Sequence, residues 1–184
     1  MRKLLFTAFA LAALVSAAQD KYNYSMFNKL TEIKGSIYVI ASVEHHTKMD
    51  VENENLLFIN TLTGATLKQD FPKDARIGKI THIRIDSLEL NRILIPARTV
   101  NLDNSKSIDW RDPLKLYVCM VDGSNLKAIT PDNFFVSQWE INSSTATMVI
   151  IGNTDTNGNG RWDKTDKSEI MLFNLKTLTE IQML

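Results

Sequence analysis

The chain has a single cysteine, Cys119, among its 184 residues, which excludes an internal disulfide framework. Charge of one sign is not in excess either, because 21 Lys and Arg residues balance 21 Asp and Glu residues. A nucleic-acid partner, which requires a basic face, is therefore not expected. Cys119 lies in the apolar run 116–120, and we expect a buried core thiol there rather than a reactive one.

Signature motifs of the common enzyme classes are missing. The sequence has no G-x-S-x-G elbow, no H-E-x-x-H zinc motif and no glycine-rich phosphate loop. Its serines and carboxylates show no spacing that implies a catalytic triad. We therefore expect a non-enzymatic protein. A carboxylate pair brought together by folding would make a small glycan or peptide hydrolase the alternative.

The N-terminus predicts a signal peptide over residues 1–18. Arg2 and Lys3 precede an apolar stretch, 4–15, that is too short to span a bilayer, and small residues favour cleavage after Ala18. The mature chain, 19–184, keeps 19 basic residues against 21 acidic ones and has no run near the roughly 20 apolar residues of a membrane helix. We expect a periplasmic or extracellular protein, with an uncleaved membrane anchor as the alternative.

Short apolar, β-rich segments recur about 55 residues apart along the chain. Each repeat has a central strand, a polar stretch, a second strand, and a turn that leads to a shorter strand. A further alternating strand precedes each central one. The central strands are 37–41, 92–96 and 148–152, the second strands are 56–59, 116–120 and 170–173, and the turns are Thr63-Gly64, Asp122-Gly123 and Lys176-Thr177.

This pattern predicts an all-β fold in a single domain, 19–184. No segment shows a long apolar period of 3.6 residues, so helices are not expected. Four short strands per unit are typical of a propeller blade, and the three units cover about 28–72, 76–131 and 132–184. A β-sandwich of meandering strands is the alternative, because it also has short alternating strands at regular spacing.

The second hairpin carries a family resemblance. Residues 116–130 read LYVCMVDGSNLKAIT, which resembles the TolB-like, WD-related β-propeller repeat, where LYVMDxDGSNxxxLT is a common form. Residues 139–143 are similar to the W-S-P-D-G segment of that family, without its Pro-Asp-Gly turn, and inserted D-x-N-G-D-G loops also occur there. Such propellers usually have six or more blades, whereas this chain has room for three. The resemblance therefore implies an open fold or a ring completed by a second copy.

Residues 155–166 read D-T-N-G-N-G-R-W-D-K-T-D and have the spacing of an EF-hand calcium loop. Oxygen-bearing side chains occupy loop positions 1, 3, 5, 9 and 12, Gly160 at position 6 permits the sharp turn, and a backbone carbonyl at position 7 completes the set. We therefore predict a Ca²⁺ site formed by Asp155, Asn157, Asn159, Arg161, Asp163 and Asp166.

Strands rather than helices are expected on both sides of this loop, so we predict a static staple and not a calcium sensor. Position 12 is Asp166 instead of the bidentate Glu of the strongest sites, which lowers the expected affinity. The alternative is a turn without metal, because Asn, Asp and Gly favour turns by themselves.

A similar arrangement occurs 54 residues earlier, in residues 101–112. Lys106 takes the glycine position there, and its charge would oppose a cation. We expect a solvated loop descended from the same repeat, with a second metal site as the alternative. The aligned side chains are Asn101, Asp103, Ser105, Asp109 and Asp112.

Two of the three tryptophans, Trp110 and Trp162, lie in these equivalent loops. We expect each to pack onto its own sheet, because large aromatic side chains are mostly buried. An exposed aromatic rim for sugar or peptide is the alternative. Trp139 lies on a predicted strand and is expected in the core.

Together these features predict a secreted β-repeat protein whose activity is binding and whose calcium loop is structural. The expected partners are a protein or cell-envelope component, or a second copy that completes the propeller as a homodimer. A hydrolase and a structural subunit of an envelope assembly are the alternatives.

Overall fold

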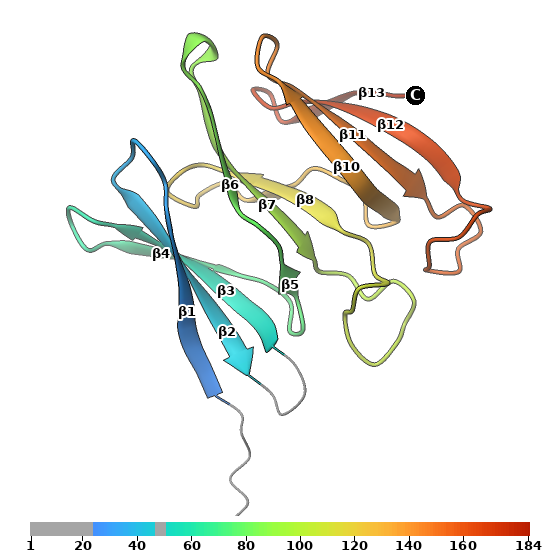
Figure 1. The fold of residues 1–184 in the computed structure, drawn as a ribbon, viewed down its shortest axis with the longest axis horizontal. Coiled ribbons are helices and arrows are strands. Elements are labelled where there is room, and N and C mark those ends of the chain that lie inside the picture. The colour runs from blue at the N-terminus through green and yellow to red at the C-terminus, as the bar shows by residue number, and fades with distance from the viewer. Residues whose placement is uncertain (1–23, 47–50) are drawn as a thin grey trace, which may run out of the picture.

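The computed structural model of the protein describes residues 24–46 and 51–184, and it is all-β, as the sequence predicts (Figure 1). The predicted signal peptide, 1–18, lies outside the described residues. The described chain contains no helix that is long and apolar enough to cross a membrane.

Three antiparallel sheets follow one another along the chain, and each is a meander of neighbouring strands. Sheet A contains β1 (Tyr24–Glu32), β2 (Tyr38–His46), β3 (Val51–Asn60) and β4 (Thr66–Asp70). Sheet B contains β5 (Arg76–Ile77), β6 (Thr81–Ile85), β7 (Leu90–Arg98), β8 (Lys115–Cys119) and β9 (Lys127–Ala128), with a 3₁₀ turn at Asp86–Leu88. Sheet C contains β10 (Phe134–Asn142), β11 (Thr147–Thr154), β12 (Lys167–Asn174) and β13 (Thr179–Met183).

The predicted strands and turns are confirmed, with one addition. Both β5 and β6 pair with the edge of β7 that β8 leaves free, so sheet B is four strands wide although it has five segments. The sequence did not indicate the two-residue strand β5. Among the described residues the three sheets form neither a closed ring nor a barrel, and three sheets rather than the two of a sandwich make up the fold.

Sheet B lies between the other two sheets and is buried on both faces (Figure 1). Successive side chains of a strand point to opposite faces. In β7, Ile93 and Ile95 therefore pack with the core of sheet A, whereas Leu94 packs with that of sheet C. A strand with two buried faces needs an unbroken apolar run, which explains the sequence Ile-Leu-Ile at this point.

Sheets A and C bury one face each. In β11, Met148 and Ile150 are fully buried toward sheet B, while Ile151 points outward and is 39% exposed beside its cross-strand partner Ile170. On sheet A the outward Leu30 of β1 is 70% exposed. A solvated sheet face ordinarily carries polar side chains, so both end sheets present unusually apolar outer faces.

Cys119 is confirmed as a core thiol. Its side chain is buried between sheets A and B, and this burial raises its pKa to about 12. The thiolate is therefore not formed at neutral pH, and a reactive role for Cys119 is not supported.

Candidate functional site

The loop 155–166 connects β11 to β12 and is shaped by its own side-chain oxygens. Asp155 accepts the backbone N–H groups of Gly158 at 2.7 Å and Gly160 at 2.8 Å through its two carboxylate oxygens. Asn157 Oδ1 accepts the N–H of Asn159 at 2.9 Å, and Asn159 Oδ1 accepts that of Arg161 at 2.8 Å. These Asx-type turns hold the chain between Asp155 and Arg161 in a tight loop.

Asp163 is the acidic centre of this arrangement. Its Oδ2 accepts the side-chain amides of Asn157 at 3.0 Å and Asn159 at 2.7 Å, and its Oδ1 accepts the backbone N–H of Thr165 at 2.7 Å. The hydrogen bonds from Thr165, followed by those from the two asparagines, hold the pKa of Asp163 well below its usual range. Asp163 is therefore anionic at neutral pH.

Asp166, at position 12, closes the loop. Its side chain is buried, and its two oxygens accept the backbone N–H groups of Asp163 at 2.8 Å and Thr156 at 3.4 Å. The side chain of Arg161 leaves the loop and donates a hydrogen bond to Asp103 at 3.2 Å.

The loop fits calcium chemistry through mixed oxygen donors rather than through a carboxylate cluster. Within the ranges that the structure describes, no group of three or more His, Cys, Asp or Glu side chains is arranged to hold a metal. The oxygens of Asp155, Asn157 and Asn159 each accept a backbone N–H and retain a second lone pair. Carboxylate, amide carbonyl and backbone carbonyl oxygens are the donors that Ca²⁺ takes.

The loop 101–112 between β7 and β8, called here the sister loop, repeats this hydrogen-bond scheme. Asp112 accepts the N–H groups of Asp109 at 2.8 Å and Leu102 at 2.9 Å, as Asp166 does in its own loop. Asp109 accepts the N–H of Arg111 at 2.8 Å, as Asp163 does from Thr165. The alignment from sequence is therefore also a structural equivalence.

The sister loop differs from loop 155–166 because two of its carboxylates form ion pairs with arginine side chains. The guanidinium of Arg111 lies on Asp109, at 2.6 Å between Nη2 and Oδ2, and Arg161 reaches across from loop 155–166 to Asp103 at 3.2 Å. Its left-handed residue is Asn104, at the position of Gly158, and Lys106 does not take the left-handed conformation of Gly160. Two carboxylates of the sister loop are thus paired with arginines, one arginine from each loop.

The two loops pack against each other through Gly160. This glycine has a φ of +71°, and a β-carbon added there would lie 2.6 Å from the carbonyl carbon of Leu102 in the sister loop. Position 6 is therefore glycine for two reasons: the turn requires a left-handed residue, and the neighbouring backbone leaves no room for a side chain.

We expect Gly160→Ala to separate the two loops. The matched control is Gly158→Ala, because Gly158 has the same φ of +71° but no neighbouring atom within 4 Å of an added β-carbon. Both changes impose a backbone strain of about 1–2 kcal/mol, whereas only Gly160→Ala forces the loops apart. Hydrogen exchange should therefore speed up in residues 101–112 for Gly160→Ala alone; equal exchange in both variants would contradict the contact.

The predicted packing of the loop tryptophans onto their own sheets is wrong. Trp110 is 77% exposed and Trp162 is 58% exposed, so the alternative, an exposed aromatic rim, describes the structure. The reason is that the loops pack on each other and leave both indoles outside. Trp139, by contrast, is half-buried against the core of sheets B and C, close to expectation.

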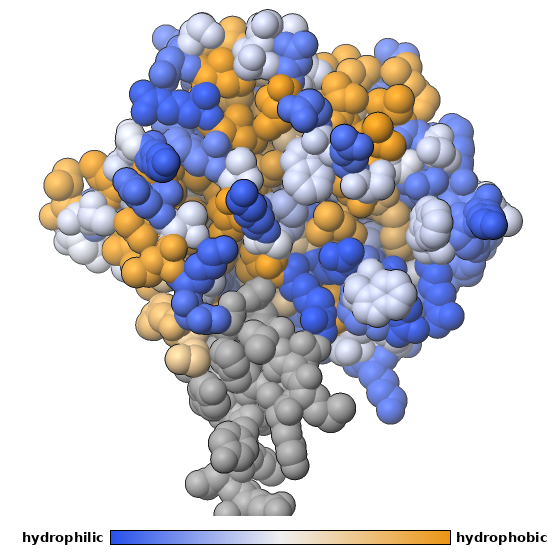
Figure 2. Space-filling view, in the orientation of Figure 1, coloured by the Kyte–Doolittle hydropathy of each residue, from blue (hydrophilic) through white to orange (hydrophobic). Residues whose placement is uncertain are grey.

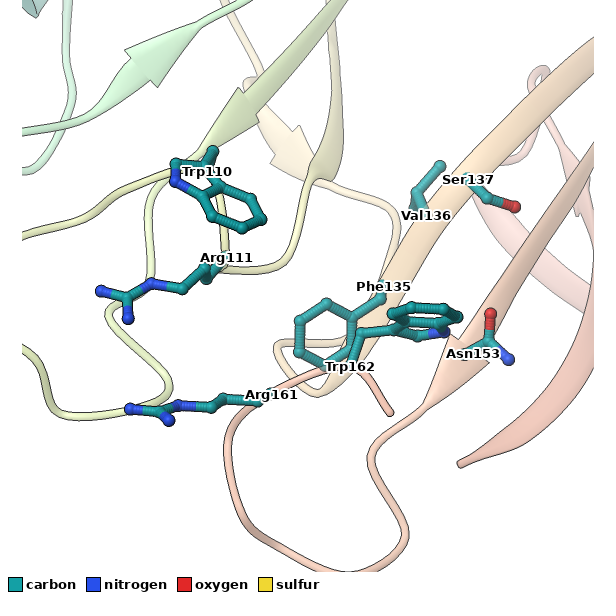
Figure 3. A pocket seen from close by; sticks show the side chains of 8 residues that line it. All are labelled: Trp110, Arg111, Phe135, Val136, Ser137, Asn153, Arg161 and Trp162. Carbon is teal, nitrogen blue, oxygen red and sulfur yellow. The ribbon is translucent and has the colours of Figure 1, made fainter. Parts of the chain in front are cut away.

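The two indoles line a concave region of about 550 Å³, called here the Trp groove (Figure 3). Trp110 and Arg111 approach from the sister loop, Phe135 and Trp162 lie across from them, and the side chain of Arg161 extends below Arg111. The surface around the two loops is mostly hydrophilic, whereas hydrophobic and hydrophilic residues are mixed over sheet A (Figure 2). The sequence did not indicate that β10 contributes to this site; the only available signal was the pair of tryptophans at equivalent loop positions.

No protein-family model, no curated protein and no solved structure matches this chain. The resemblance to TolB-like repeats therefore stays a prediction from the sequence.

Proposed function

We propose that the chain is a secreted, non-enzymatic binding protein, periplasmic or extracellular, and that the Trp groove is its binding face. The observation that carries this proposal is the exposure of two indoles, from separate loops, on one groove. Aromatic side chains that converge on a concave surface are typical of ligand sites. Their position on two loops fixed to the ends of packed sheets supports a rigid, preformed site.

A binding role is favoured over a hydrolase by the lining of the groove. Glycoside hydrolysis commonly uses two carboxyl groups that flank the scissile bond. The described residues that line the Trp groove include no Asp or Glu. The nearby acids, Asp109 and Asp103, are engaged by Arg111 and Arg161 and are not available as a general acid and base.

We infer that Ca²⁺ is the structural cofactor of loop 155–166. Asp155, Asn157, Asn159 and Asp163, the carbonyl of Arg161 and the closing residue Asp166 would hold it. The bound ion would neutralise the carboxylates and fix the loop that carries Trp162. Support comes from the oxygen-bearing side chains at loop positions 1, 3, 5, 9 and 12, and from the flanking strands, which leave the loop little freedom to act as a sensor.

A test of the binding role is co-sedimentation of the mature protein with an insoluble cell-envelope preparation. We expect the wild-type chain in the pellet, and Trp110→Ala and Trp162→Ala mainly in the supernatant. Leu62→Ala is the matched control, because Leu62 is as exposed as Trp110 but lies in the β3–β4 turn, away from the groove. A wild-type protein that stays in the supernatant would contradict the proposal.

We further propose that the three sheets are half of a six-bladed propeller that a second copy completes. The apolar outer faces of sheets A and C support this, because sheet B shows that each internal face of the fold is covered by a neighbouring sheet. With two-fold symmetry, sheet C of each copy would cover sheet A of the other.

The expected result is a dimer by multi-angle light scattering, and a monomer for Ile151→Lys, which places a charge on the outer face of sheet C. Ser143→Lys adds the same charge in the exposed β10–β11 turn and should remain a dimer. A monomeric wild-type protein would contradict the dimer proposal and would mean that the three sheets form an open fold.

A further inference from the structure

The Trp groove has little net charge, although two arginines line it. Arg111 is paired with Asp109 and Arg161 is paired with Asp103, so each positive charge has its own counter-ion within the protein. An anionic ligand would have to compete with these carboxylates for the guanidinium groups. The groove therefore favours a ligand without net charge.

The strand that forms one wall of the groove is not suited to pair with a peptide. β10 is an edge strand of sheet C, and peptides commonly bind such edges as an added strand. Its pairing with β11 shifts between Val136 and Gln138, and Ser137 at this bulge donates its hydroxyl to the carbonyl of Ile151 at 3.0 Å. Bulges disrupt the regular backbone ladder that strand addition requires.

The groove offers a ligand the flat apolar faces of aromatic rings, together with one side-chain amide. Trp110 and Trp162 present indole rings, and the Phe135 ring appears between them (Figure 3). The side-chain amide of Asn153 also lines the groove, and no described residue hydrogen-bonds to it. It thus has donors and an acceptor free for a ligand.

We propose that the Trp groove binds a neutral saccharide chain. A pyranose ring has a C–H face that can stack on the electron-rich face of an indole, and hydroxyl groups at its rim that pair with an amide. The volume of about 550 Å³ lies within the range of small-molecule sites. This inference rests on the proposed binding function and names the ligand class of the same site.

The deciding experiment repeats the co-sedimentation with envelope preparations treated in two ways. Periodate cleaves the vicinal diols of sugars, whereas protease removes polypeptide. We expect periodate to abolish the binding of the wild-type protein and protease to leave it unchanged. Binding that survives periodate and is lost after protease would overturn the saccharide inference while leaving the binding function intact. Absence of binding to the untreated preparation would instead count against the binding function itself.

A second measurement uses defined probes. Neutral 1,4-linked hexasaccharides of glucose and of xylose, whose rings keep vicinal diols, are titrated into the mature protein, with tryptophan fluorescence as the readout. We expect at least one to bind, with an affinity about tenfold lower for Trp110→Ala and for Trp162→Ala, and unchanged for Leu62→Ala. No measurable affinity for any of them, or equal affinities for wild type and the groove variants, would overturn the inference.

Discussion

Ca²⁺ at about one hundred times its dissociation constant is expected to raise the melting temperature of the mature protein by about 8 °C. Such an excess stabilises the folded state by about 2.7 kcal/mol, and 1 kcal/mol shifts the melting temperature of a chain of this size by about 2–4 °C. Asp155→Ala should abolish the rise, because Asp155 is the first ligand position and also anchors two backbone amides of the loop.

The control for this experiment is Asn101→Ala, at the first position of the sister loop. Asn101 anchors its own loop through Ser105, but that loop already holds arginine counter-ions, so the calcium-dependent rise should be retained. Asp155 has two roles, as an acceptor of backbone N–H groups and as a negatively charged ligand. Asp155→Asn separates them, because the amide oxygen can still accept one backbone N–H while the negative charge is removed. A melting temperature that is equal with calcium and with chelator would show that loop 155–166 is a turn without metal.

Gly123→Ala is expected to destabilise the fold by about 3 kcal/mol. Gly123 lies in the β8–β9 turn with a φ of +88°, and an added β-carbon would lie 2.6 Å from Cγ of the buried Phe58 in sheet A. Backbone strain contributes about 1–2 kcal/mol, and overpacking of a core ring adds about 1–3 kcal/mol. The melting temperature should fall by about 9 °C.

Gly64→Ala is the matched control for Gly123→Ala. Gly64 occupies the equivalent turn of sheet A with a φ of +73°, and nothing lies within 4 Å of an added β-carbon. Only the backbone strain applies, so its melting temperature should fall by about 3 °C. Similar losses in both variants would show that the turn of sheet B does not dock on sheet A, despite the hydrogen bond from Gln69 to the carbonyl of Gly123.

The strands could be predicted from the sequence because their signal is local. Apolar runs such as 92–96 and 148–152 lie in β7 and β11, and Asp122-Gly123 marks a hairpin turn. The order in which the sheets pack could not be predicted, although one feature of the sequence is related to it. The run Ile93-Leu94-Ile95 is apolar on both faces because β7 lies in the middle sheet, whereas β11 and β12 alternate more clearly.

In the two loops as well, interactions within one loop could be predicted from the sequence, whereas interactions between the loops could not. Their side-chain hydrogen bonds could be anticipated from spacing, because each joins residues within the same loop. The contact between Gly160 and Leu102 and the ion pair between Arg161 and Asp103 join residues 58 apart, and no local pattern encodes them. For this reason the exposure of Trp110 and Trp162 was predicted wrongly, and the Trp groove could not be foreseen.

The contact between the loops also affects how a metal would be acquired. Two arginines, Arg111 of the sister loop and Arg161 of loop 155–166, already pair with carboxylates of the sister loop. We therefore expect the sister loop to keep its shape without calcium. The sister loop would then be a surface against which Gly160 packs whether or not calcium is bound. A loop that is shaped before an ion arrives loses little conformational entropy on binding it. Preorganisation of this kind would offset the affinity lost by having Asp rather than Glu at position 12.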